Sequence, residues 1–337
     1  MSISKATEEG AKAVSKLADL VSNTLGQPFK AKQIKKQAEA MAYAVDTIGD
    51  AYRRNSDVPI KIDDGKLSIS NEIANLNIDN EITKEIKKQL TELIQRTSNR
   101  LAYQEITKQQ NIEKIVSNTF NQLVNSDEII TKDVEEEWAH RFFDYAGKVS
   151  KEDLQLLWSK MLAGEIKKPG SFSKRTLEVF NSMSSGEAQL FQKLASFVSH
   201  IGGIRHFYRK FEVVDEFYKY DDLIVLQDAG LLNLNESIMW GFEVKANGKE
   251  AIRINNKVIV FENESSVSQK VDIPVYLLTS AGKEILNIID CSPNENYSKL
   301  LAQQMKREFK NVNISLHKIS NILESTIKYN AKNELEN

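Results

Sequence analysis

A helical period that persists from Ile82 to Leu123 is the feature that most constrains this chain. Apolar residues recur along that stretch at three- and four-residue spacing. A continuous helix of this span would be about 60 Å long, which exceeds the width of a small domain. A rod of that length bends, breaks or pairs with another chain. We therefore expect one long helix or a helix pair in residues 81–126, and a homo-oligomer built partly by it.

Two shorter segments precede the long helix. Residues 1–56 have a helical period interrupted by Gly26 and Pro28, which predicts a helical pair. Residues 57–80 alternate apolar and polar side chains around Asp64-Gly65, which predicts a small β-hairpin. Four lysines follow Pro28 closely: Lys30, Lys32, Lys35 and Lys36. A solvated helix face is the favoured interpretation of these lysines, and an anionic partner, either a membrane surface or a nucleic acid, is the alternative.

Residues 127–200 predict four short helices in a compact bundle. We expect helix caps at Thr131, at Ser150 with Asp153, at Ser171 or Ser173, and at Ser184 with Glu187. Aromatic and leucine side chains at helical spacing predict the core rather than a cofactor site. The expected core residues are Trp138, Phe142, Leu157, Trp158, Leu162, Phe172 and Leu177.

Residues 201–290 predict a winged-helix-like module. A short helix at Tyr220–Leu232 is followed by two β-rich runs, Ala251–Phe261 and Val271–Leu278, and by a helix at Thr279–Ile289. Residues 291–337 predict an amphipathic helix, Tyr297–Tyr329, and a frayed polar tail. The fold class is therefore mainly α, or α+β, with a helical bundle, the small N-terminal hairpin and the C-terminal winged module.

The charge balance disfavours a uniformly basic nucleic-acid-binding protein, since 45 Lys and Arg nearly cancel 47 Asp and Glu. The single cysteine, Cys291, closes no intrachain disulfide, which fits a reducing cytosol. The start of the chain is too polar for a secretory signal, and no uninterrupted apolar stretch reaches the length of a membrane span. We expect a cytoplasmic protein.

The sequence offers no motif for catalysis, metal binding or nucleotide binding. The four histidines, His140, His200, His206 and His317, lack the spacing of a metal site. Neither the glycine-rich nucleotide loops nor a serine elbow occurs in the sequence. We therefore expect a non-enzymatic protein with no metal and no cofactor, although a catalytic site assembled from distant residues would leave no such motif.

One basic segment surrounds the Pro169-Gly170 turn. Its cations precede and begin a new helix, where exposed N–H groups favour an anion. The candidate anion-binding residues are Lys167, Lys168, Lys174 and Arg175. In the alternative that we favour, Glu165 pairs with Arg175 and the lysines only solvate the turn.

The predicted reading helix of the winged module carries Asp221, Asp222 and Asp228 and no Lys or Arg. Because DNA is a polyanion, this helix opposes the usual major-groove docking. Nucleic-acid binding through the wing remains the alternative, with Lys249, Arg253 and Lys257 as candidates. Docking of a protein partner is the favoured use of the module.

The stretch Leu157–Glu165, followed by Pro169–Ser173 and Arg175–Leu177, resembles the core of a bacterial family known only as a domain of unknown function. The resemblance covers Arg100 to Ile289. More distantly, the L-W-x-x-x-L-A helix, the S-x-x-E-A helix and a late L-T-x-x-G are similar to the Abi-alpha family, which is associated with abortive infection of phage-infected bacteria. Neither resemblance implies catalytic residues.

Together these observations predict a non-enzymatic cytosolic bacterial protein that acts through protein contacts, with phage defence or stress response as its setting. Two alternatives stay open. One is nucleic-acid binding through the wing and the Lys167–Arg175 turn. The other is membrane action by the basic N-terminal helices, as an abortive-infection effector.

Overall fold

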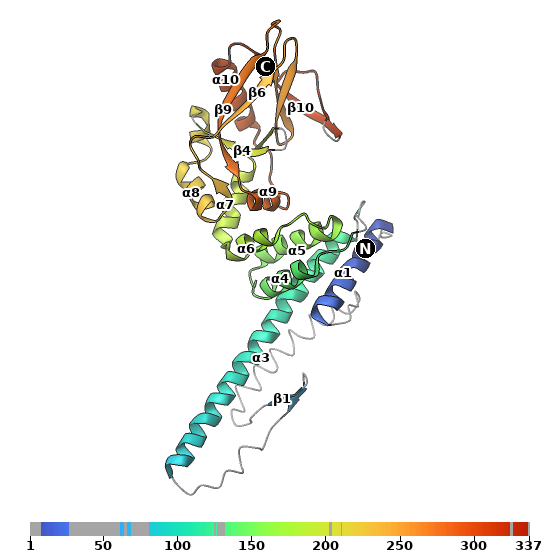
Figure 1. Cartoon of the computed structure of the whole chain (residues 1–337), viewed down its shortest axis with the longest axis vertical. Helices are drawn as coiled ribbons and strands as arrows, with labels where there is room; N and C mark the ends of the chain where they lie inside the picture. Colours follow the sequence, from blue (N-terminus) through green and yellow to red (C-terminus); the bar gives the residue numbers. More distant parts are fainter. Residues whose placement is uncertain are drawn as a thin grey trace. The chain divides into compact units, whose positions relative to one another are not determined.

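The computed structural model describes residues 8–26, 61–63, 66–68, 81–124, 126, 132–201, 204–209, 211–323 and 326–335. The chain divides into two compact units, Met1–Pro169 and Gly170–Asn337, which are coloured blue to green and green to red in Figure 1.

The first unit is helical. Its helices are α1 (Glu8–Leu25), α3 (Glu81–Leu123), α4 (Glu136–Ala146) and α5 (Glu152–Lys167). The predicted long helix is present as one continuous element, since α3 has 43 residues. At 1.5 Å per residue α3 is about 65 Å long. Figure 1 shows that α4 and α5 pack only beside the C-terminal part of α3.

Aromatic rings from two helices form the centre of the first unit, as their spacing predicts. The rings of Trp138 and Phe142 stack with centroids 5.2 Å apart, and the edge of Phe142 meets Trp158 at 5.2 Å. Leu162 is also fully buried. Leu157 is partly exposed, because the residue before Trp158 lies about 100° away around the helix.

The predicted N-terminal hairpin is present: β1 (Lys61–Asp63) pairs antiparallel with β2 (Lys66–Ser68). The predicted second N-terminal helix and its lysines, Lys30, Lys32, Lys35 and Lys36, lie outside the described residues, as does Thr131.

The helices of the second unit are α6 (Lys174–Ser182), α7 (Ser185–Ala195), the 3-10 helix η2 (Glu212–Glu216), α8 (Tyr220–Asp228), α9 (Ser280–Leu286) and α10 (Glu295–Glu308). The four helices predicted as one bundle are therefore divided, because α4 and α5 belong to the first unit and α6 and α7 to the second. Phe172 and Leu177 are buried in the second unit.

The caps of α6 and α7 confirm two of the predicted helix starts. Ser173 Oγ accepts a hydrogen bond from the backbone N–H of Thr176, and Ser184 and Glu187 form a reciprocal capping box. The cap predicted at Ser150 is wrong, since α5 begins after Lys151 without a side-chain cap.

The predicted mainly α fold with a winged-helix module is wrong, because the second unit is built on a 9-stranded antiparallel sheet. The strand order is β11-β10-β8-β7-β3-β4-β9-β5, and β6 also pairs with β9. The strands are β3 (Ser199–Ile201), β4 (Ile204–Tyr208), β5 (Leu232–Asn233), β6 (Met239–Val244), β7 (Lys249–Ile254), β8 (Lys257–Glu262), β9 (Gln269–Leu278), β10 (Asn313–Leu323) and β11 (Thr326–Tyr329).

The expected wing strand Ala251–Phe261 is in fact two strands. Asn255 adopts a left-handed backbone with φ of 52°, and it turns the chain between β7 and β8, which pair antiparallel. Asparagine tolerates this conformation better than most residues, so the turn has a sequence signal that the alternation of apolar residues hid.

The helix predicted for Tyr297–Tyr329 is also wrong beyond its first third, since α10 ends at Glu308 and β10 follows. In β10, Ile314 and Leu316 are buried and the side chains alternate between the two faces. The end of the chain is not a frayed tail either. The backbone N–H groups of Asn330 and Glu334 donate to carbonyl groups of β10, those of Lys318 and Leu316.

Candidate functional site

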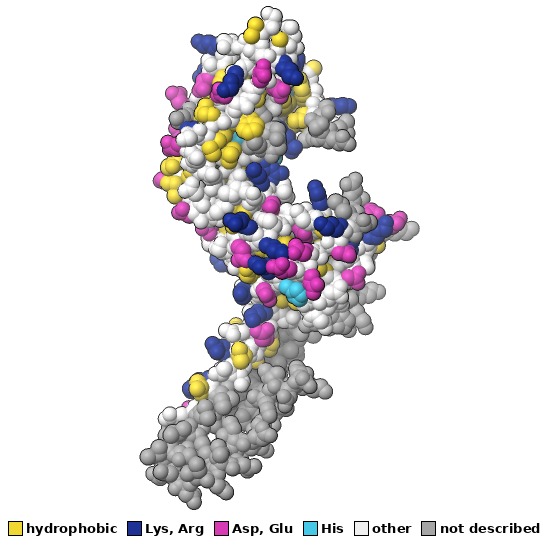
Figure 2. Space-filling view, viewed as in Figure 1, with side chains coloured by type: hydrophobic (Ala, Val, Ile, Leu, Met, Phe, Trp, Pro, Cys, Tyr) yellow, Lys and Arg dark blue, Asp and Glu magenta, His cyan; other side chains and the backbone are white. Residues whose placement is uncertain are grey.

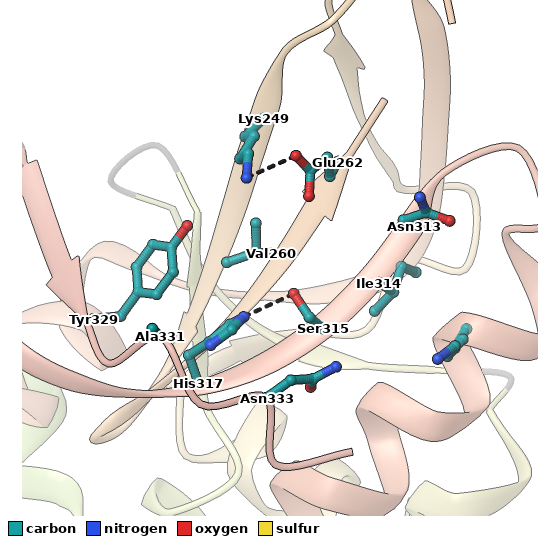
Figure 3. Close-up of a pocket in the computed structure, with 11 residues that line it drawn as sticks. Lys249, Val260, Glu262, Asn313, Ile314, Ser315, His317, Tyr329, Ala331 and Asn333 are labelled. Carbon is teal, nitrogen blue, oxygen red and sulfur yellow. Dashed lines mark hydrogen bonds and ion pairs between the residues drawn. The ribbon is translucent and has the colours of Figure 1, made fainter. Parts of the chain in front are cut away.

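A polar cavity of about 500 Å³ lies at the edge of the sheet in the second unit, between β7, β8, β10 and the segment after β11 (Figure 3). Most of its side chains are polar or charged. The lining residues are Lys249, Val260, Glu262, Lys306, Asn313, Ile314, Ser315, His317, Tyr329, Ala331 and Asn333.

His317 and Ser315 point from the same face of β10 into this cavity (Figure 3). Nδ1 of His317 lies 2.9 Å from the carbonyl oxygen of Asn330 and 3.1 Å from that of Lys332. Because carbonyl oxygens only accept hydrogen bonds, a neutral His317 carries its proton on Nδ1. Its Nε2 then accepts from the Ser315 hydroxyl, 2.8 Å away.

A hydroxyl that donates to an oriented imidazole is the beginning of a nucleophilic site. The same hydrogen bonds also have a structural role here. His317 is 8% exposed, and its Nδ1 holds the segment after β11 against β10, where the Asn333 side chain also accepts from the Leu316 N–H. Attachment of the C-terminal segment therefore accounts for the hydrogen bonds of His317 without a catalytic role.

The charged groups in the cavity largely cancel. Lys249 Nζ lies 2.7 Å from Glu262 Oε1, an ion pair that Figure 3 shows across β7 and β8. Lys306 is exposed and adds one further cation. The cavity therefore offers hydrogen-bonding groups to a small polar molecule, without a strong excess of either charge.

The three candidate nucleic-acid contacts, Lys249, Arg253 and Lys257, do not form a free basic surface. Lys249 is paired with Glu262. The Lys257 side chain is 6% exposed and pairs with Glu295 and with Glu334, the latter at 2.6 Å. Arg253 alone of the three has no carboxylate partner in the described part of the chain. Two of the three cations are thus already neutralised, which argues against phosphate contacts by the predicted wing.

The candidate anion-binding segment spans the division between the units. Lys167 is the last residue of α5 and Lys168 follows it, whereas Lys174 and Arg175 begin α6. Lys168 and Lys174 each make a further interaction. At the start of α6 the backbone N–H of Ser173 already donates to the Glu284 carboxylate at 2.7 Å. A carboxylate of the protein therefore occupies part of the position predicted for an external anion.

A second candidate surface lies on α8 and the start of β6. Leu223 and Leu226 bury one face of α8, but apolar side chains also point outward. These are Tyr220, Ile224 and Val225, which are 49%, 36% and 41% exposed, and Met239 of β6, which is 50% exposed. We call these four residues the α8 surface. Figure 2 shows hydrophobic side chains gathered over this part of the second unit.

Two buried side chains, Tyr276 and Arg209, link the α8 part of this surface to Met239. The Tyr220 ring lies 6.2 Å from the Tyr276 ring. The Arg209 guanidinium lies over Tyr276 at 5.8 Å and its Nη2 is 3.8 Å from the Met239 sulfur. The sequence does contain a signal for this surface, since apolar residues occur on both faces of one short helix. Helix periodicity alone does not show that the outward-facing ones form a binding site.

Within the described residues, no three His, Cys, Asp or Glu side chains are grouped so that they would hold a metal ion. The described helices also include none with the length and apolar character needed to cross a bilayer.

A family model described as Protein of unknown function (DUF2806) matches residues 95–302, more than half of the chain. The chain belongs to this family. No curated protein and no solved structure matches it. The family match supports the part of the sequence resemblance that names an uncharacterised family, and it contains the α8 surface. Most of the residues that line the polar cavity lie at 306–333, beyond the matched range.

Proposed function

We propose that this member of the DUF2806 family is a non-enzymatic binding protein whose α8 surface contacts a partner protein. The observation that carries the proposal is the exposure of four large apolar side chains, three on α8 and Met239, which Tyr276 and Arg209 link to α8. Single exposed apolar residues are common, but a contiguous patch is typical of a binding site. Aromatic residues and methionine are enriched at protein interfaces, and this surface has both.

The charges around the surface indicate the chemistry of the partner. Asp221, Asp222 and Asp228 lie on the same helix, and Asp221 and Asp228 are exposed. An acidic helix that presents tyrosine, isoleucine and valine suits an apolar segment flanked by lysine or arginine. The same carboxylates oppose a nucleic acid, so the helix favours a protein over DNA.

The direct test is cross-linking in the native host. Lys219, exposed next to α8, is an anchor for an amine-reactive cross-linker. We expect mass spectrometry to find cross-links from Lys219 to one protein, near an apolar segment with basic flanks. Ile224→Lys places an unpaired charge in the interface and should abolish those cross-links.

The matched control is Val267→Lys, because Val267 is also an exposed apolar residue of the second unit, at 66% exposure. It should leave the cross-links unchanged, and Asp228→Lys should weaken them by reversing a complementary charge. Equal capture by wild type and Ile224→Lys would refute the proposal. So would capture that nuclease removes. Cross-links between two copies of this chain would replace the partner protein by a second copy.

Oligomerisation through α3 is a separate part of the proposed function. Leu93, Leu101 and Tyr103 on this helix are 53%, 45% and 67% exposed, and a second copy of α3 would cover them. We expect light scattering to give a mass above one chain, which Leu101→Asp should reduce to that of the monomer. A monomeric wild type would refute this contact and leave the α8 surface unaffected.

The cellular setting that we propose is phage defence or stress response in a bacterial cytoplasm. It rests on the distant resemblance of the L-W-x-x-x-L-A and S-x-x-E-A helices to the Abi-alpha family, a different family from the one whose model matches the chain. Deletion of the gene should raise the plating efficiency of at least one phage, and Ile224→Lys should reproduce the deletion if the α8 surface mediates defence. An unchanged efficiency across a broad phage panel would remove defence from the proposal.

A further inference from the structure

Three basic side chains form one row across three neighbouring strands of the sheet. In the register of β3 with β7, His200 is opposite Arg253, and in the register of β3 with β4 it is opposite Arg205. Directly opposed residues of antiparallel strands share a face, with Cβ atoms about 5 Å apart. Arg253, His200 and Arg205, which we call the basic row, therefore lie side by side on one face.

No carboxylate of the described residues pairs with the basic row. Arg205 Nη1 donates to the backbone carbonyl of Lys283 at 2.7 Å. Arg253 Nε donates to the backbone carbonyl of Asn255 at 3.1 Å. These carbonyl groups satisfy donors but do not neutralise the charge. Two arginines lie near each other without a carboxylate partner, an arrangement that costs free energy in the folded protein.

The pKa values of His200 and Arg205 are both lowered in this environment. Burial first, and then the charges of Arg205 and Arg253, lower the pKa of His200 to about 4. Burial and the neighbouring Arg253 also lower the pKa of Arg205. The nearby charges that act on these groups are all positive. An anion bound next to these side chains would raise both pKa values.

A cavity of about 390 Å³ opens beside the Arg253 end of the row. The other residues that line it are Asn255, Asn256, Cys291, Pro293 and Ile319. Amide groups, a proline ring and an isoleucine side chain can accommodate a part of a ligand that combines polar and apolar groups. The volume is that of a small-molecule site.

We propose that the basic row binds the phosphate group of a phosphorylated small molecule, and that the cavity beside Arg253 holds the rest of that molecule. Two arginines on one face of the sheet, one on each side of His200, suit a phosphate, which arginine binds through paired N–H donors. The row is partly buried and limited to three residues, which suits one phosphate better than the repeated phosphates of a nucleic acid.

Calorimetry on the full chain tests this proposal with inorganic phosphate, ribose 5-phosphate, AMP, adenosine and a 12-residue single-stranded oligonucleotide as probes. We expect ribose 5-phosphate or AMP to bind more tightly than inorganic phosphate, and adenosine not to bind. Arg253→Gln and Arg205→Gln should each weaken binding by about tenfold or more, since each removes a charge-assisted contact.

Lys270→Gln is the matched control, because Lys270 is a cation of the same sheet but lies on β9 and is paired with Asp272 outside the row. It should leave the affinity within about twofold of wild type. Far-UV circular dichroism checks that each variant folds. Absence of binding by every phosphorylated probe, equal binding by both arginine variants, or binding of the oligonucleotide alone would each overturn the proposal. None of these outcomes bears on the α8 surface.

Discussion

Two sets of cationic side chains lie close together in the C-terminal sheet, one paired with carboxylates and the other without a carboxylate partner in the described part of the chain. Lys257 at the start of β8 is buried and contacts the carboxylates of Glu295 and Glu334. Arg253, four residues earlier on β7, is opposite His200, and within the described chain it has no carboxylate partner. Positive charge alone therefore does not identify a site. Charge that the fold leaves without a counter-ion does, because structural cations are normally paired.

The largest predicted effect is loss of the paired cation. Lys257→Met leaves two carboxylates facing each other without their partner, and we expect the free energy of unfolding to fall by about 2–3 kcal/mol. The loss is smaller than for a fully buried pair because the Glu295 side chain is 60% exposed. Urea denaturation of the full chain measures it. Adding Glu295→Gln and Glu334→Gln should recover most of the loss, and an unchanged midpoint in Lys257→Met would contradict the comparison.

His200 should make the free energy of unfolding decrease at acidic pH. The pKa of His200 is lowered from 6.5 to about 4 in the folded protein. The unfolded state therefore binds more protons between these values, so stability is full above pH 6.5 and falls as the pH decreases toward 4. We expect about 2 kcal/mol after allowance for the partial exposure of the ring.

Denaturation midpoints at a series of pH values measure this effect, and His200→Gln is the control that should flatten the profile between pH 6.5 and 4. The same slope in wild type and in His200→Gln would assign the acid sensitivity to other groups.

A smaller effect separates the two causes that act on His200. Arg253→Gln removes one of the two neighbouring positive charges, so the pKa of His200 should rise by a fraction of a unit. It should stay below 6.5, since burial is the larger cause. Proton NMR titration of the imidazole measures this shift. A pKa that does not move would mean that the arginine is too far from His200 to act with it on one anion.

The smallest effect is expected at the exposed ion pair. The side chains of Lys249 and Glu262 are 54% and 38% exposed, and exposed pairs contribute only about 0.2–1 kcal/mol. Lys249→Gln should therefore change the free energy of unfolding by less than about 0.5 kcal/mol, as measured in the same urea experiment. A loss as large as that of Lys257→Met would show that exposure does not distinguish the two lysines.

Local sequence patterns predicted the helical parts of this molecule well. The stripe through Trp138 and Phe142 and the capping box at Ser184 depend only on residues a few positions apart, so periodicity and capping chemistry are sufficient. The sheet was missed for the opposite reason. The pairing of β10 with β8 joins residues more than 50 positions apart, and the apolar residues of β10 also fit a helical spacing over a short window.

The candidate sites divide in the same way. Arg253 could be named from the sequence as a basic residue of a wing, but its neighbours could not, because His200 and Arg205 reach it only through strand register. The exposed side of α8 could not be predicted from the sequence either. Its acidic residues were readable from the sequence, whereas the exposure of Ile224 and Val225 depends on which face the sheet and its loops cover.

The attachment of the C-terminal segment has a consequence for synthesis of the protein. Leu316 on β10 accepts from the backbone N–H of Glu334, and the Glu334 carboxylate completes the pairing of Lys257. On the ribosome, Lys257 emerges many residues before its second partner. The helices of the first unit can form while translation continues. The outer edge of β10 cannot be covered until residue 334 has left the exit tunnel, so the nascent chain exposes that edge of β10 during that interval.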